Sequence, residues 1–82
     1  AAMAHAHDLP ISPHGNQDIG VHVVAGVPNG LTVEYYRAST DPMYDLWCKE
    51  PLRVDNGVVH PPERPGLGIE LNDEVLKDFR VG

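Results

Sequence analysis

The amino-acid sequence predicts an α/β fold that the chain alone does not complete. Over residues 1–36, segments typical of a helix end, a strand, a loop, a helix and a second strand follow one another. This alternation is typical of a parallel α/β sheet. A parallel sheet needs more than two strands, and the residues after 36 offer no further strand–helix unit. We therefore expect residues outside this chain to complete the sheet.

The length and composition argue against a self-contained catalyst. The chain has 82 residues, whereas a typical domain has about 100–150. A chain this short buries only about 60% of the surface that it exposes when unfolded. Glycine and proline number 8 each, which indicates turns, short elements and ordered loops.

Charge and cysteine content exclude several classes of partner. The net charge of −6 repels phosphate groups, so we expect no nucleic-acid partner. No apolar run approaches the about 20 residues of a membrane span, so we expect no membrane association. Cys48 is the single cysteine and has no partner for an internal disulfide. This favours a reducing compartment, and we expect a cytoplasmic protein.

The first elements are a helix end and a short extended stretch. Residues 1–7 are small and compatible with a helix. Asp8 and Pro10 end the helical geometry, because proline lacks an amide donor and restricts the residue before it. Residues 9–12 read as a short strand, and residues 13–16 as the loop at its end.

Residues 18–27 are ambiguous between strand and helix. Four valines favour a strand. Ile19, Val23 and Val27, however, recur at helical spacing, and Asn16 can cap a helix. We expect a helix. It stops at Pro28-Asn29-Gly30, and the branched and aromatic residues 31–36 predict a second short strand.

The remaining residues predict short, separate elements. Residues 43–47 indicate a short helical or irregular segment. Residues 52–55 and 58–60 flank Asn56-Gly57, the favoured pair for a type I′ hairpin. Residues 61–68 are too rich in proline and glycine for regular structure. Residues 72–79 predict a helix capped by an asparagine, with acidic residues in its first turn.

Two residues stand where catalytic groups of parallel α/β proteins gather. His14 directly follows the first predicted strand, and Glu34 lies toward the end of the second. The carboxyl ends of parallel strands open into one shared mouth, so the two side chains form a plausible acid/base or electrophile pair. The alternative is a buried structural histidine and a solvated glutamate.

The other histidines indicate structural or surface positions. His5 and His7 are two residues apart on a helix and point away from one another, so they cannot chelate one ion. His22 lies on the second helix, where a packed or capping role is the commoner one. His60 has no acidic neighbour in the predicted hairpin, so we expect it at the surface.

These residues resemble a known family. The run 8–14, then His22, then Glu34 twenty residues after His14, resembles the C-terminal part of the mandelate racemase branch of the enolase superfamily. The tail 65–71, Pro-Gly-Leu-Gly-Ile-Glu-Leu, resembles the C-terminal signature of that branch, and the resemblance spans essentially all 82 residues.

The resemblance implies a modified TIM barrel, (β/α)7β, together with an α+β capping domain. Residues 1–47 would form the end of the barrel: the last turns of a barrel helix, the seventh strand, its helix, the eighth strand and a connecting segment. Residues 48–82 would form the hairpin, the Pro/Gly loop and a short helix that returns to the capping domain. The chain would be incomplete in isolation.

The resemblance also implies a chemistry, namely removal of the proton next to a carboxylate to give an enediolate stabilised on Mg²⁺. Carried over residue by residue, His14 matches the general base of the seventh strand. Glu34 matches the acid of the eighth strand, which stabilises the enediolate by donating a hydrogen bond in its protonated form. The Mg²⁺ ligands, the aspartate partner of the base and any second base are expected outside this chain, which contributes no metal or cofactor ligand.

We favour a sugar-acid dehydratase, because one histidine can remove the α-proton and then help the β-hydroxyl leave as water. A racemase or epimerase and a cycloisomerase of the same superfamily are alternatives. The parent protein is expected to be a homo-oligomer that acts on a small sugar acid. The isolated chain is expected to be catalytically inert, and a small histidine-based metal-binding or interaction module is the remaining alternative.

Overall fold

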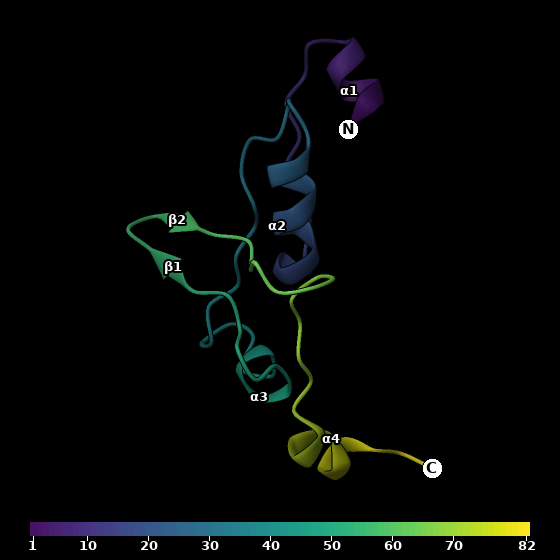
Figure 1. Cartoon of the computed structure of the whole chain (residues 1–82), viewed down its shortest axis with the longest axis vertical. Coiled ribbons are helices and arrows are strands. Elements are labelled where there is room, and N and C mark those ends of the chain that lie inside the picture. The colour runs from purple at the N-terminus through teal and green to yellow at the C-terminus, as the bar shows by residue number, and fades with distance from the viewer.

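Short helices and one small hairpin are joined by long irregular segments (Figure 1). The computed structural model describes all residues, 1–82. The elements are α1 (Ala2–Ala6), α2 (Gln17–Gly26), α3 (Tyr44–Trp47), β1 (Val54–Asp55), β2 (Val58–Val59) and α4 (Asp73–Phe79). The molecule is elongated, with extents of 46 × 32 × 26 Å. Figure 1 shows α1 and α4 at opposite ends, with the hairpin projecting to one side.

The two expected parallel strands are side by side but form no ladder. The Ile11 amide donates to the Asn29 carbonyl and the Leu31 amide to the Ile11 carbonyl, both at 2.9 Å. Together they make one isolated parallel bridge, Ile11 to Gly30. The predictions of strands at 9–12 and 31–36 were therefore wrong beyond that bridge. The physical reason is that a parallel pair needs neighbouring strands to be stable, and this chain supplies none.

Helix α2 confirms the choice of helix over strand for the valine-rich segment. Its first turns are buried through Gln17, Asp18, Gly20 and Val21. The expected side-chain cap from Asn16 is wrong in detail. Asn16 precedes the helix in the left-handed conformation, with φ at 41°, and its side chain makes no capping hydrogen bond. Its backbone carbonyl instead accepts from the Ile19 and Gly20 amides.

The hairpin confirms the type I′ prediction. Strands β1 and β2 pair antiparallel in the register Val54 to Val59 and Asp55 to Val58. Asn56 and Gly57 have φ values of 52° and 79°, and type I′ turns require positive φ at both central residues. The expected short helices also form, as α1, α3 and α4, although Asn72 makes no side-chain cap to α4.

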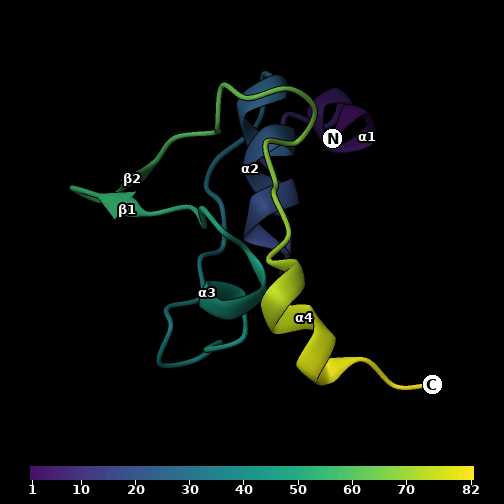
Figure 2. The ribbon, with the colours of Figure 1, turned by 60° about the horizontal axis from the view of Figure 1, so that its bottom comes forward.

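The C-terminal residues run back along α2 and α3, as Figure 2 shows. The Leu67 carbonyl lies 2.8 Å from the His22 Nε2 atom. His22 therefore connects α2 to the Pro/Gly loop of residues 61–68 by a hydrogen bond. Cys48 and Leu71 form an isolated antiparallel bridge, and the Asn72 amide donates to the Trp47 carbonyl at 2.7 Å. These contacts place the C-terminal residues beside α2 and the end of α3.

Little of the chain is buried. Seven of the 82 residues are buried, and the apolar ones among them with a side chain are Val21, Tyr44 and Cys48. Large apolar side chains such as Leu31, which is 64% exposed, face solvent instead. The barrel implied by the resemblance is thus not formed by these residues alone, whose only sheet is two-stranded. None of the helices has both the length and the apolar character needed to cross a membrane.

Candidate active site

His14 and Glu34 meet in the structure, as the sequence predicts. The His14 Nδ1 atom lies 2.9 Å from the Glu34 Oε2 atom. The same Oε2 atom accepts a hydrogen bond of 2.6 Å from the Gly15 backbone amide. The His14 side chain is 89% exposed and the Glu34 side chain 38%. The pair is therefore held by the protein on one side and open to solvent on the other.

Side-chain contacts between the two parallel segments bring this pair together, one residue out of step with the bridge between Ile11 and Gly30. Ser12 lies opposite Thr32, because the Ser12 hydroxyl is 2.9 Å from the Thr32 carbonyl oxygen and 3.0 Å from its hydroxyl. His14 and Glu34 follow two residues further along each segment. His14 then lies opposite Glu34, and these four residues with Pro13 line one open recess.

The surrounding donors favour the ionised form of Glu34. The Gly15 amide hydrogen bond, the Tyr36 hydroxyl and the neighbouring His14 lower the pKa of Glu34, against a smaller opposing effect of burial. The pKa of Tyr36 is raised by the same hydrogen bond to Glu34. This is opposite to the protonated form expected from the resemblance. The reason is that the neighbours supplied by this chain are hydrogen-bond donors, which stabilise a carboxylate.

The contact between Glu34 and the Gly15 amide should depend on pH in a defined direction. A carboxyl group whose folded pKa is lowered contributes its full stabilisation above its unfolded pKa, and this is lost as the pH falls through the lowered folded pKa. We expect the shift of the Gly15 amide proton resonance that reports protonation of Glu34 to have its midpoint below the ordinary pKa of glutamate. A pH titration by ¹H–¹⁵N NMR measures this, and a midpoint above the ordinary glutamate pKa would contradict the assignment.

Two residues near the pair were missed by the sequence reasoning. Tyr36 follows Glu34 by two residues and so shares its face, a spacing that could have identified it. Gln17 is only 3% exposed, and its side-chain amide bonds the Tyr36 backbone. Gln17 is a long polar residue at the first position of a helix that begins just after the loop of His14. This position is the only feature of the sequence that could have indicated a role for it.

No metal site is formed by these residues. No three histidine, cysteine, aspartate or glutamate side chains lie close enough together to hold a metal ion. Glu34 is already engaged by His14 and Gly15, and the recess that it lines contains no second carboxylate. Because Mg²⁺ prefers several oxygen ligands, the donors present here do not fit a Mg²⁺ site.

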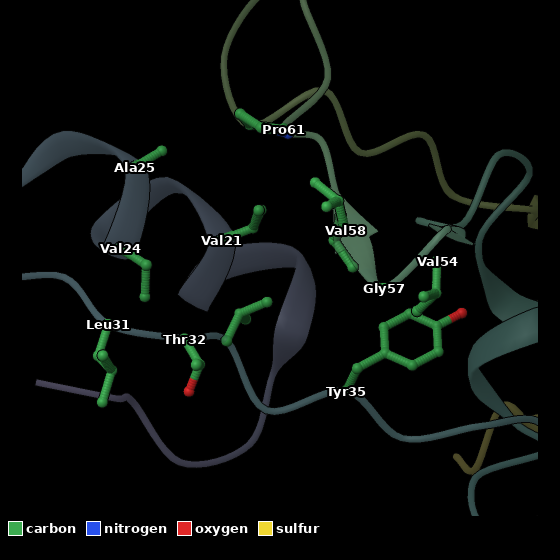
Figure 3. A pocket seen from close by; sticks show the side chains of 12 residues that line it. Val21, Val24, Ala25, Leu31, Thr32, Tyr35, Val54, Gly57, Val58 and Pro61 are labelled. Carbon is green, nitrogen blue, oxygen red and sulfur yellow. The ribbon is translucent and has the colours of Figure 1, made fainter.

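The structure has a second, larger cleft, and Figure 3 shows the side chains that line it. It has a volume of about 460 Å³ and lies between α2, residues 31–33 with Tyr35, and the hairpin. Its lining includes Val21, Val24 and Val58, and it contains no histidine or acidic residue. The cleft is therefore largely apolar, whereas the recess of His14 and Glu34 brings a histidine and a carboxylate together, and this recess is the candidate active site.

Known proteins resemble this chain over its whole length. It is 34% identical over 82 residues to a 3,6-anhydro-alpha-L-galactonate cycloisomerase of Streptomyces coelicolor, covering 100% of this chain and 22% of that protein. It is 32% identical over 94 aligned positions to a D-galactarolactone cycloisomerase of Agrobacterium fabrum, covering 99% of this chain and 25% of that protein. It is 33% identical over 82 positions to an arabinonate dehydratase of Saccharolobus solfataricus, covering 95% of this chain and 22% of that protein.

The chain thus spans about a quarter or less of the length of these relatives. No solved structure matches it significantly. Residues 1–75 match the family described as Enolase C-terminal domain-like. The match covers nearly all of the chain, including His14, Glu34 and residues 65–71. The chain therefore belongs to the Enolase C-terminal domain-like family of the enolase superfamily.

Proposed function

We propose that this chain is the C-terminal part of a longer enzyme that removes the proton next to the carboxylate of a sugar acid and then eliminates water. The observation that carries the proposal is the contact of 2.9 Å between His14 and Glu34 in an open recess. The names of the relatives support the substrate class, since arabinonate, galactonate and xylonate dehydratases are among them. The full-length enzyme is the protein that contains this chain and the rest of the barrel.

The fold of the family supports the placement of the pair. The family has an α/β fold that contains a TIM barrel, and active sites of TIM barrels lie at the carboxyl ends of the strands. We propose that residues 1–47 are the end of that barrel and residues 48–82 the segment that returns to a capping domain. The parallel bridge between Ile11 and Gly30 supports this, because it makes the two segments neighbours in a parallel arrangement.

In this proposal His14 is the general base. Its Nδ1 atom faces the Glu34 carboxylate, which favours the tautomer with the proton on Nδ1. The Nε2 atom then has a free lone pair, and the ring is open to solvent. A substrate whose α-hydrogen lies within about 3 Å of Nε2 gives up that proton to His14, and the imidazolium can return it to a departing β-hydroxyl.

Glu34 is proposed to act on the substrate carboxylate. In the free protein the Glu34 carboxyl group is ionised, because donors surround it. A bound substrate carboxylate beside it adds a like charge, which raises the pKa of Glu34 and favours the protonated form. Protonated Glu34 donates a hydrogen bond to the carboxylate as negative charge builds on it.

Members of this superfamily generally use Mg²⁺. We propose that the full-length enzyme does so with ligands that lie outside this chain, since the residues described here form no metal site. His14 and Glu34 act on the substrate directly.

A cycloisomerase is the second candidate. Two of the relatives, from Streptomyces coelicolor and Agrobacterium fabrum, carry that name, and they align with nearly all of this chain. Both reactions can begin with the same proton transfer at carbon next to a carboxylate, so the pair of His14 and Glu34 is compatible with either. The substrate distinguishes them, because a dehydratase needs an open-chain β-hydroxyl, whereas a cycloisomerase needs a cyclic sugar acid.

The test is a panel of open-chain and cyclic sugar acids, assayed with the full-length enzyme and Mg²⁺. We expect dehydration of at least one open-chain acid to a 2-keto-3-deoxy acid, and loss of activity with a chelator. The matched control is the chain of residues 1–82 alone, which should be inactive. Turnover only of cyclic acids would favour the cycloisomerase, and turnover by the chain alone would contradict the proposal that the site is shared with the rest of the enzyme.

A further inference from the structure

We infer that Gln17 is a positioning residue that holds Glu34 opposite His14. This inference rests on the proposed function, because it concerns the same pair. Gln17 is the first residue of α2 and lies three positions after His14. Its partner Tyr36 lies two positions after Glu34. A link between Gln17 and Tyr36 therefore fixes the two segments relative to one another just beyond the pair.

The Gln17 side chain pairs with both polar groups of the Tyr36 backbone. The Gln17 Oε1 atom accepts from the Tyr36 amide at 2.7 Å, and the Gln17 Nε2 atom donates to the Tyr36 carbonyl at 3.3 Å. A primary amide presents one acceptor and one donor side by side, as a peptide group does. Gln17 thus makes the two hydrogen bonds that a neighbouring strand would make at this position.

This link matters because the segment has no other backbone support there. No backbone–backbone hydrogen bond involves any of residues 32–36. The last such bond before them is that of Leu31, at the isolated bridge to Ile11. Contacts that involve side chains hold the rest: Ser12 with Thr32, the Gly15 amide with Glu34, the Tyr35 hydroxyl with the Leu52 carbonyl, and Gln17 with Tyr36. Among these contacts, Gln17 is the one that bonds both the amide and the carbonyl of a backbone residue beyond Glu34.

Burial makes the Gln17 link specific. Gln17 is 3% exposed, and a buried polar group needs hydrogen-bond partners. If the hydrogen bonds between Gln17 and Tyr36 are lost, water cannot replace them unless the surrounding residues rearrange. Proton transfer requires heavy-atom distances of about 2.6–3.2 Å, and a displacement of about 1 Å can cost about 100-fold in rate. Release of Tyr36 therefore affects catalysis through the position of Glu34, although Gln17 itself does not touch the recess.

The experiment compares Gln17→Met and Gln17→Glu with the wild-type full-length enzyme. Methionine keeps the length of the side chain and removes both hydrogen bonds. We expect Gln17→Met to lower kcat per folded enzyme by about 10- to 100-fold at all pH values, with KM changed by less than about threefold. The matched control is Asn16→Gly, at the neighbouring residue whose side chain makes no cap and whose φ of 41° glycine tolerates. It should keep the wild-type kcat.

Gln17→Glu tests the inference through the pH dependence of kcat, which a purely structural role of Gln17 would leave unchanged. The glutamate can accept from the Tyr36 amide at any pH, but it can donate to the Tyr36 carbonyl only when protonated. Burial raises the pKa of a carboxyl group. The introduced carboxyl group should therefore become protonated, and able to donate to the Tyr36 carbonyl, within an accessible pH range. We expect kcat of Gln17→Glu relative to wild type to rise as the pH falls from 8 to 5, whereas the ratio for Gln17→Met stays flat.

The outcomes separate this inference from the proposed function. If His14→Asn abolishes turnover but both Gln17 variants keep kcat within about twofold of wild type, the inference is wrong and the proposed function stands. If His14→Asn also retains turnover, the proposed function itself fails. Should Gln17→Met prove insoluble, the pH dependence of Gln17→Glu alone decides, and a flat ratio overturns the inference.

Discussion

Replacing His14 by asparagine is expected to lower kcat of the full-length enzyme by about 10²–10⁴-fold, the contribution that a general base typically makes. Asparagine keeps a nitrogen donor near the position of Nδ1, so the contact with Glu34 can persist. It has no counterpart of the free Nε2 lone pair, so no group remains to accept the α-proton. Steady-state dehydration of a saturating sugar acid with Mg²⁺ measures the loss.

The matched control for this variant is His7→Asn. His7 is an exposed histidine at the end of α1, and its described contact is a backbone hydrogen bond that asparagine also makes. We expect wild-type kinetics from it. A kcat of His14→Asn within about threefold of wild type would remove His14 as the base, provided that circular dichroism shows the same fold for both variants.

Replacing Glu34 by glutamine is expected to lower kcat by about 10²–10³-fold, comparable to the loss of one preorganised hydrogen-bond donor to a developing negative charge. Glutamine has nearly the same shape as glutamate. It cannot form the charge-assisted contacts that Glu34 makes with the Gly15 amide and His14, and its amide is a weaker donor than a carboxylic acid. Most of the effect should fall on kcat rather than KM, because the interaction strengthens in the transition state.

Glu70→Gln is the matched control for Glu34→Gln. Glu70 pairs with Lys49 at 2.7 Å, and its side chain is 61% exposed. Surface ion pairs of this kind contribute little to stability, so activity should be unchanged. Equal losses for the two variants would show that the effect of Glu34→Gln comes from general destabilisation rather than from the candidate site.

The candidate pair could be predicted because it depends on chain direction and spacing. His14 and Glu34 each lie near the end of an extended segment, and the two segments are parallel neighbours. Groups at the ends of neighbouring parallel segments lie at the same edge, and the contact of 2.9 Å between His14 and Glu34 fits that expectation. The hairpin was predictable for a similar reason, since the backbone conformation of Asn56-Gly57 is a local property of those two residues.

What the sequence could not predict depends on distant partners. The branched and aromatic residues 31–36 favour a strand, but a strand forms only with neighbours, and this chain offers a single bridge. The ionised state of Glu34 likewise follows from the Gly15 amide and Tyr36, which the sequence alone does not place beside it. The role of Gln17 could not be predicted, because a glutamine at the start of a helix is not typical of any particular contact. Only the fold shows that Tyr36 lies beside it.

The most direct test of the central claim is exchange of the α-hydrogen with solvent. The full-length enzyme is incubated in D₂O with Mg²⁺ and either a substrate or a slowly reacting sugar acid, and deuterium at the α-carbon is followed by ¹H NMR. We predict deuterium incorporation by the wild-type enzyme and by His7→Asn, and none above background by His14→Asn. Exchange by His14→Asn at the wild-type rate would contradict the assignment of this histidine as the base that the chain contributes.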